Sequence, residues 1–327
     1  MGSIQEPVRG LFRFAVPDFS VPAEDRMFYP SPASKEVSDQ NLELHDFRTS
    51  NEIVKGPRGL DIQGFTYVEH QSALAEDAWF AEGNIENVYV AECIGLILNA
   101  TGASRAIVDG ISFRRKSPQD QDNDQFYMLK RGCDLDVAVS KIPRGVMRVT
   151  GRQAATSLQP SRAFHVDYSV KGLQDTVRWC RKDIVEVAKP TIDAEDAGLS
   201  PRYAAYSIWR PLKTVTKDPI AVLDWRTADK SELVAASSRA LSGVTEDGEY
   251  IRESLIATPP KNPKSQTWYW MPEQEPHEVL IIKFSDTGAV KDGNIARHCV
   301  HGSPKLNGTE GLPDRESIEC RILAFWD

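Results

Sequence analysis

Long apolar runs are missing from this sequence, and its richest apolar windows, 91–98 and 279–284, are only as long as a buried strand or helix core. The first residues lack the positive and apolar segments of a secretory signal. The five cysteines are scattered and include no CxxC pair, which excludes a zinc ribbon and favours reduced thiols over a disulfide framework. We therefore expect a cytoplasmic protein that does not associate with membranes.

The chain also lacks an excess of positive charge. Its formal net charge is −8, and no long block of Lys and Arg is present. Phosphate contacts supply most of the affinity for nucleic acid, so an acidic chain of this kind is a poor candidate for binding DNA or RNA. The apolar share of 41% is that of an ordinary globular protein. We expect a small-molecule substrate as the partner, with a homodimer as the default assembly.

The distribution of strand signals predicts a mainly β (α+β) fold. Residues 1–40 are rich in proline and are expected to form an irregular N-terminal arm with a short extended stretch around residues 11–16, and residues 41–327 a single domain. Short strand-like runs without βαβ alternation favour a sandwich or barrel with flanking helices. The strands that matter most for the site are expected at 163–168, 203–209, 278–284, 295–300 and 317–326, and helices at 173–182 and 230–240.

The sequence holds six histidines, and one of them opens a His-x-Asp motif, His165-Val166-Asp167. Residues at i and i+2 of a strand point to the same side, so His165 and Asp167 can bind one metal ion together. With a second imidazole from another strand they would form a facial triad, whose open positions suit non-heme Fe(II) oxygenases. A short motif of this kind also occurs by chance, and a surface His beside a surface Asp is the alternative interpretation.

The second imidazole is sought in the apolar segment 295–300. His298 and His301 are three residues apart, which would place them on opposite faces of a strand, so both are not expected to be ligands. We predict His298 as the third ligand. His301 would then support a metal ligand, face the substrate or have a structural role.

Several motifs in order along the chain resemble one known family. They include Thr101-Gly102-Ala103-Ser104-Arg105, the His165-x-Asp167 motif, Ile208-Trp209-Arg210-Pro211-Leu212, Trp268–Pro272 and the segment Pro313–Arg321. Together they are similar to the fungal family that includes gibberellin desaturase and the aspergillic-acid hydroxylase/desaturase, whose members are non-heme Fe(II)/2-oxoglutarate-dependent oxygenases. The resemblance covers roughly residues 40–327.

The resemblance implies a double-stranded β-helix (jelly-roll/cupin-like) core, Fe(II), 2-oxoglutarate as co-substrate and O₂. It also implies that the chain hydroxylates, desaturates or oxidatively cyclises a small natural product or amino acid in fungal secondary metabolism. It maps the metal ligands onto His165, Asp167 and His298.

For the carboxylates of the co-substrate, the resemblance makes Arg315, Arg321 and Arg210 the candidates. Strand alternation places Arg315, Ser317, Glu319 and Arg321 on one face, so a buried Glu319 would need a partner such as Arg321 or Arg210. We favour Arg315 together with Ser317, because this pair supplies two kinds of donor.

Aromatic residues near the triad are the candidates for the substrate side of the pocket. These are Tyr168, Trp209, Trp268 and Trp270, with His301 beside them. The alternative is that each is simply part of the core.

Two other functions remain open from the sequence alone. One is an iron-dependent, cupin-like dioxygenase that does not use 2-oxoglutarate. The other is a catalytically inactive barrel that serves as a partner subunit.

Overall fold

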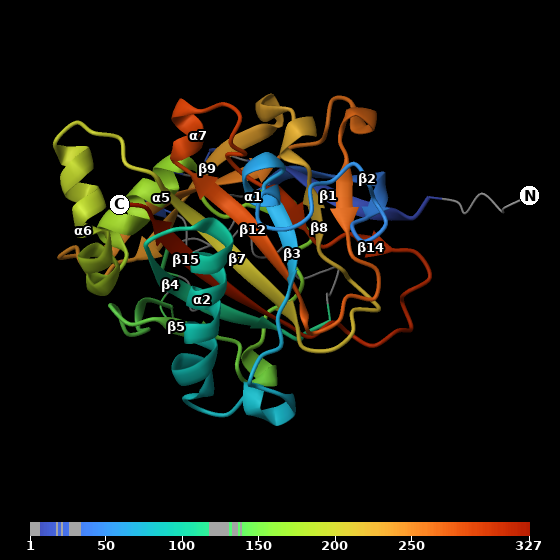
Figure 1. The fold of residues 1–327 in the computed structure, drawn as a ribbon, viewed down its shortest axis with the longest axis horizontal. Coiled ribbons are helices and arrows are strands. Elements are labelled where there is room, and N and C mark those ends of the chain that lie inside the picture. Colours follow the sequence, from blue (N-terminus) through green and yellow to red (C-terminus); the bar gives the residue numbers. More distant parts are fainter. Residues whose placement is uncertain are drawn as a thin grey trace, which may run out of the picture.

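The protein is described by a computed structural model, which covers residues 7–17, 19–20, 22–25, 34–117, 131–132, 137 and 139–327. Two β-sheets dominate it, and the helices α2 (Val90–Thr101), α5 (Val170–Trp179) and α6 (Lys182–Asp196) lie outside them (Figure 1). Side chains from both sheets meet in one hydrophobic cluster, including Val222 and Tyr269 from one sheet and Trp209 and Leu280 from the other. The predicted mainly β fold is therefore confirmed.

The larger sheet has nine strands in the order β14-β1-β2-β11-β8-β13-β6-β10-β9. Along the chain these are β1 (Arg9–Pro17), β2 (Ser34–Asp46), β6 (His165–Val166), β8 (Ala221–Leu223), β9 (Leu233–Leu241), β10 (Glu249–Ala257), β11 (Trp268–Trp270), β13 (His301–Gly302) and β14 (Lys305–Leu306). The short strands β6, β8 and β13 are neighbours in the middle of this sheet, so they bring distant parts of the chain together.

The smaller sheet has six strands in the order β3-β12-β7-β15-β4-β5. They are β3 (Phe65–Glu69), β4 (Arg105–Arg114), β5 (Arg148–Thr150), β7 (Tyr203–Pro211), β12 (Glu278–Asp286) and β15 (Ser317–Phe325). β15 lies between β7 and β4 and alternates strictly. Leu323 and Phe325 point to the cluster between the sheets, whereas Ile318 and Cys320 point to the cluster beneath α2.

The α-helices are α1 (Gly59–Ile62), α2 (Val90–Thr101), α5 (Val170–Trp179), α6 (Lys182–Asp196) and α7 (Gly288–Lys291). α2 ends where Gly102 takes a left-handed conformation with φ of 69°, which glycine adopts without steric cost. α5 begins directly after the His-x-Asp motif, because the Ser169 side chain accepts a hydrogen bond from the Gly172 backbone N–H and caps the helix. Among the described residues, no helix has both the length and the apolar character needed to cross a bilayer.

Three expectations from the sequence are corrected by the fold. The irregular arm expected over residues 1–40 contributes β1 and β2 to the larger sheet, and residue 40 falls inside β2. The helix expected at 230–240 is the strand β9, which pairs along its length with β10. The strand expected at 295–300 is irregular, and only His301 and Gly302 after it form a strand.

Candidate metal centre and the adjoining pocket

Two short strands of the larger sheet bring three metal-binding side chains together. His165 on β6 and His301 on β13 are direct partners in the ladder between these strands, and paired residues point to the same face. Asp167 follows two residues after His165. Potential ligand atoms of His165, Asp167 and His301 all lie within 4.8 Å of one another, and within the described part of the chain this is the one such group.

His298, the predicted third ligand, is not a member of this group. Its Nδ1 lies 2.7 Å from the backbone oxygen of Phe284, and its ring packs edge-on against Trp225 with centroids 5.5 Å apart. The prediction failed because it applied strand alternation to residues 295–300, which do not form a strand. The structure places His301, not His298, beside the His165 and Asp167 pair.

Both imidazoles of the group are oriented by the backbone. Nδ1 of His165 is 2.8 Å from the carbonyl oxygen of Ala163, and Nδ1 of His301 is 3.1 Å from that of Cys299. A carbonyl oxygen can only accept, so each Nδ1 must carry the proton and donate. Nε2 is then the ring nitrogen left to bind a cation, and on His165 the cation would take the place of any proton that Nε2 shares with Asp167.

The charges around the group also favour metal binding. Burial alone would raise the pKa of Asp167, but Arg321 and His165 outweigh this effect and hold the pKa well below its ordinary value. Burial and the neighbouring His165 lower the pKa of His301 to about 4, so this imidazole is neutral at pH 7. Arg321 Nε donates to Asp167 Oδ2 at 2.7 Å, while Oδ1 faces Nε2 of His165 at 3.2 Å. Asp167 is thus ionised, and one of its oxygens is already engaged.

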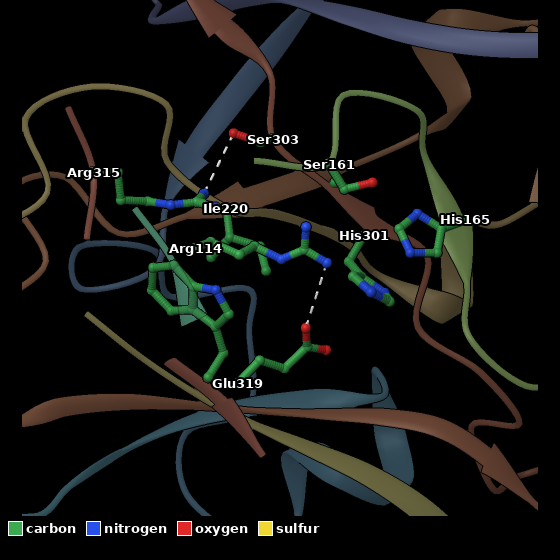
Figure 2. Close-up of a pocket in the computed structure, with 10 residues that line it drawn as sticks. Arg114, Ser161, His165, Ile220, His301, Ser303, Arg315 and Glu319 are labelled. Carbon is green, nitrogen blue, oxygen red and sulfur yellow. Dashed lines mark hydrogen bonds and ion pairs between the residues drawn. The ribbon is translucent and has the colours of Figure 1, made fainter. Parts of the chain in front are cut away.

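A pocket adjoins the two histidines (Figure 2). Its walls come from both sheets and from the loops between them. The lining residues are Arg114, Ser161, His165, Trp209, Ile220, His301, Gly302, Ser303, Arg315 and Glu319.

Arg315 supplies a buried cation to this pocket. Its Nη1 donates to the backbone oxygen of Asp218 at 2.7 Å and to Ser303 Oγ at 3.4 Å, and its guanidinium lies 5.2 Å from the Trp209 ring centre. Burial lowers its pKa to about 9. Arg315 Nε and Ser317 Oγ are both buried without a hydrogen-bond partner, and such unpaired groups are costly unless an acceptor joins them. Arg315 and Ser317 are the two residues predicted from the sequence to bind a carboxylate of the co-substrate.

The other two arginine candidates lie elsewhere. Arg321 binds Asp167 and lies 3.4 Å from Glu319, which confirms the expected pairing of that carboxylate. Arg210 points to the opposite face of the smaller sheet, where it donates to the backbone oxygens of His70 and Pro276 at 2.8 and 2.7 Å. Arg210 therefore does not reach the pocket.

Of the aromatic residues expected to line the pocket, Trp209 does so. Trp268 and Trp270 lie on the other face of the larger sheet, and Trp268 packs against Phe12 with ring centroids 4.9 Å apart. Tyr168 is fully buried between the sheets and donates its hydroxyl proton to Asp109. These three residues are core residues.

Sequence reasoning missed four lining residues, namely Ser161, Ile220, Gly302 and Ser303. Arg114 also lines the pocket; from the sequence, Arg114 and Arg115 are candidates either for contact with an acidic substrate or for a surface salt bridge. Ser303 follows β13 directly, so the same strand that carries His301 also carries a contact of Arg315. Arg114 ends β4, where its ladder partner is Ser317, and this pairing was the signal that a strand alignment could have supplied.

The family described as "Oxidoreductase/YMDC permease-like domain" matches residues 22–325. The gibberellin cluster GA4 desaturase of Gibberella fujikuroi is 33% identical over 288 residues, which cover 82% of each chain. The Fe(II)/2-oxoglutarate-dependent dioxygenase nvfI of Aspergillus novofumigatus is 24% identical over 332 residues, covering 95% of this chain and 94% of that one.

The solved structure of an iron and alpha-ketoglutarate-dependent endoperoxidase, NvfI, superimposes with a TM-score of 0.61 at 20% identity and covers 97% of both chains. This likeness supports the predicted double-stranded β-helix. The family match spans most of the chain, and the similarity to the desaturase is substantial. This chain belongs to the family of fungal Fe(II)/2-oxoglutarate-dependent oxidoreductases that includes the GA4 desaturase.

Proposed function

We propose that this chain is an Fe(II)/2-oxoglutarate-dependent oxygenase that oxidises a small molecule in fungal secondary metabolism. The observation that carries the proposal is the compact group of His165, Asp167 and His301 next to a pocket that contains the buried cation Arg315. Both parts are needed by such an enzyme, one for the metal and one for the dicarboxylate.

The three side chains fit Fe(II). Two neutral imidazole nitrogens and one carboxylate oxygen are the donor set of the facial triad, which leaves other coordination positions open. His165 and His301 would bind through Nε2 because each Nδ1 is held by a carbonyl oxygen, and Asp167 would bind through Oδ1. The bound iron would supply the site for O₂ and the keto acid and the oxidising power of the reaction.

The pocket fits the remote carboxylate of 2-oxoglutarate. Arg315 lines the pocket, and its Nε is a buried donor without a partner that a carboxylate would satisfy. Ser317, two residues along the chain, has a buried hydroxyl that is also without a partner. Ser303 and the backbone oxygen of Asp218 hold the guanidinium in place. The protein thereby binds and orients the co-substrate and keeps bulk water from it.

The relatives favour use of 2-oxoglutarate over the two other functions left open from the sequence. Their names include a desaturase, hydroxylase/desaturases and dioxygenases, so hydroxylation, desaturation and oxidative ring formation are the reaction classes to test. All of them start with removal of a hydrogen atom from the substrate, and they differ in the new bond that the substrate then gains.

The test measures O₂ uptake and succinate release by the Fe(II)-loaded protein with 2-oxoglutarate and a panel of amino acids, terpenoid acids and polyketides. The proposal predicts succinate formation that requires both iron and 2-oxoglutarate and that is abolished by Asp167→Ala with the fold retained. O₂ uptake without succinate would favour the cupin-like dioxygenase. A folded protein that binds no iron would favour the inactive barrel.

We further propose a cytoplasmic location and retain a homodimer as a prediction. The described cysteines Cys93, Cys180, Cys299 and Cys320 are free thiols, as expected in a reducing compartment. Size-exclusion chromatography with light scattering would determine the oligomeric state.

A further inference from the structure

A second arginine, Arg114, lies in the same pocket as Arg315. It ends β4 and is the ladder partner of Ser317 on β15, so its side chain leaves the sheet on the pocket side. Figure 2 shows it between Arg315 on one side and the imidazoles of His301 and His165 on the other. Arg114 and Asp167 influence each other electrostatically, and Arg114 also opposes protonation of His165, whereas neither residue is among the main influences on the pKa of Arg315.

The present contacts of Arg114 leave it able to bind another anion. Its Nη1 donates to the backbone oxygen of Gln159 at 2.6 Å, but its Nη2 is 3.7 Å from Glu319 Oε2, beyond a hydrogen bond. Burial lowers the pKa of Arg114, and Glu319 only partly opposes this effect. The guanidinium is thus desolvated, and its ion pair with Glu319 is a long one at 3.7 Å.

Glu319 does not depend on Arg114 alone. Its Oε1 accepts from Ser207 Oγ at 3.3 Å, and its Oε2 lies 3.4 Å from Arg321 Nη2. If Arg114 turned to another carboxylate, Glu319 would keep these two partners. Glu319 would therefore not be left without a partner by such an exchange.

The volume of the pocket indicates that such an exchange is needed. The cavity has a volume of about 20 Å³, whereas a single water occupies at least roughly 10–15 Å³ on this kind of measure. A five-carbon dicarboxylate therefore fits only if a side chain that now crosses the cavity moves. Arg114 is the side chain that lies between Arg315 and the histidines (Figure 2).

We propose that Arg114 binds the 1-carboxylate of 2-oxoglutarate, at the metal end, while Arg315 binds the 5-carboxylate. In doing so, Arg114 gives up its long contact with Glu319 for a short, charge-assisted hydrogen bond to the co-substrate. This inference rests on the proposed function, since it assigns the second end of the same co-substrate.

The test uses two keto acids that differ only at the remote end. 2-Oxoglutarate has both carboxylates, and 2-oxopentanoate lacks the 5-carboxylate. Each is titrated without O₂ into the Fe(II)-loaded protein, and binding is followed by the visible charge-transfer absorption of the Fe(II)–keto acid chelate. This readout gives a dissociation constant in the absence of turnover.

Arg114→Gln is expected to raise the dissociation constants of both keto acids by a similar factor of about 10 to 100, which corresponds to the loss of one charge-assisted hydrogen bond. Arg315→Gln is expected to raise the dissociation constant of 2-oxoglutarate by such a factor and to leave that of 2-oxopentanoate nearly unchanged. Arg114→Lys should recover part of the affinity. Unchanged binding in Arg114→Gln, or a loss confined to 2-oxoglutarate, would overturn the assignment.

Two further variants separate binding from a structural role. Arg115→Gln is the matched control, because Arg115 bonds Glu316 at 3.0 Å and stacks on Phe80 outside the pocket, so its loss should not change either constant. If Arg114 served only to neutralise Glu319, the double variant Arg114→Gln/Glu319→Gln would regain wild-type affinity. We expect it to stay impaired for both keto acids. A wild-type protein that binds iron but neither keto acid would instead refute the proposed function.

Discussion

At the scale of single residues, the candidate metal site is organised by groups that do not themselves face the cation. The carbonyl oxygens of Ala163 and Cys299 fix the protons of His165 and His301, and Arg321 engages the outer oxygen of Asp167. Since each donor is held before any ion arrives, binding has little ordering entropy to overcome. The site is therefore expected to be sensitive to these supporting contacts.

Arg321→Gln tests the support of Asp167. We expect affinity for Fe(II) to fall by about 10- to 100-fold, the usual effect of removing a group that orients a metal ligand, and Arg321→Lys to recover part of it. The measurement is anaerobic titration of the apoprotein with Fe(II) against a competing chelator. Arg9→Gln, which removes an exposed arginine 4.0 Å from Glu43, is the control. Equal affinity in wild type and Arg321→Gln would show that Arg321 has no positioning role.

Arg315 and Arg210 provide a second contrast, because both are buried but only one lies in the pocket. Arg315→Lys should raise the KM for 2-oxoglutarate about tenfold or more, since lysine cannot reproduce the fork of donors, with kcat at saturation changed less. Arg210→Lys should lower the melting temperature and leave this KM unchanged, because Arg210 bonds backbone oxygens in the core. Steady-state kinetics and thermal unfolding of both variants measure the KM for 2-oxoglutarate and the melting temperature. The opposite pattern would move the carboxylate site to Arg210.

At this scale, the sequence allowed prediction of one half of the metal site. His165 and Asp167 were found because two residues of one strand with period-2 spacing must share a face. His301 was missed as a metal ligand. Two residues three apart point to opposite faces only when they lie in a strand, and residues 295–300 do not form a strand. Arg315 was found because it stands with Ser317 at the start of a long apolar strand, whereas Arg114 is separated from it by most of the chain.

At the scale of elements, strands were predicted correctly where the local sequence pattern is strong. The prediction was wrong where pairing with a distant strand determines the structure. Residues 230–240 contain an alanine-rich stretch that favours a helix locally, but β9 is held by a full ladder to β10. β10 itself was not predicted as a strand, so the partner that overrides the helix was not anticipated. The extended stretch expected at 11–16 is confirmed as β1, whereas most of β2 was not anticipated because prolines precede it.

The contribution of β1 can be measured with Phe12→Ala. Phe12 is fully buried and stacks on Phe164, the residue before His165, with ring centroids 4.6 Å apart. We expect the free energy of unfolding to fall by about 3–5 kcal/mol, as for other buried Phe-to-Ala changes. Urea unfolding followed by circular dichroism measures it. Leu11→Ala on the same strand is the control, because Leu11 is 39% exposed and should change stability by no more than about 0.5 kcal/mol. Similar values for the two variants would mean that the N-terminal strand is not part of the folded core.

At the scale of the whole molecule, the candidate site lies where the two sheets face each other. The larger sheet supplies the metal group through β6 and β13, and the smaller sheet supplies Arg114, Trp209 and Glu319 through β4, β7 and β15. The fold class and the cofactors were predictable, because ordered motifs along the chain resembled one family. The pocket was not predictable, because its residues converge from separate strands and loops whose alignment no local pattern specifies.

The central claim is that His301, together with His165 and Asp167, holds Fe(II). It is tested most directly by anaerobic titration of Fe(II) into wild type, His301→Ala and His298→Ala, with circular dichroism to verify that each variant is folded. The account predicts one tightly bound iron in wild type and in folded His298→Ala, and an affinity at least about 100-fold lower in His301→Ala, since a ligand is lost. Tight iron binding by His301→Ala together with its loss in a folded His298→Ala would contradict the account.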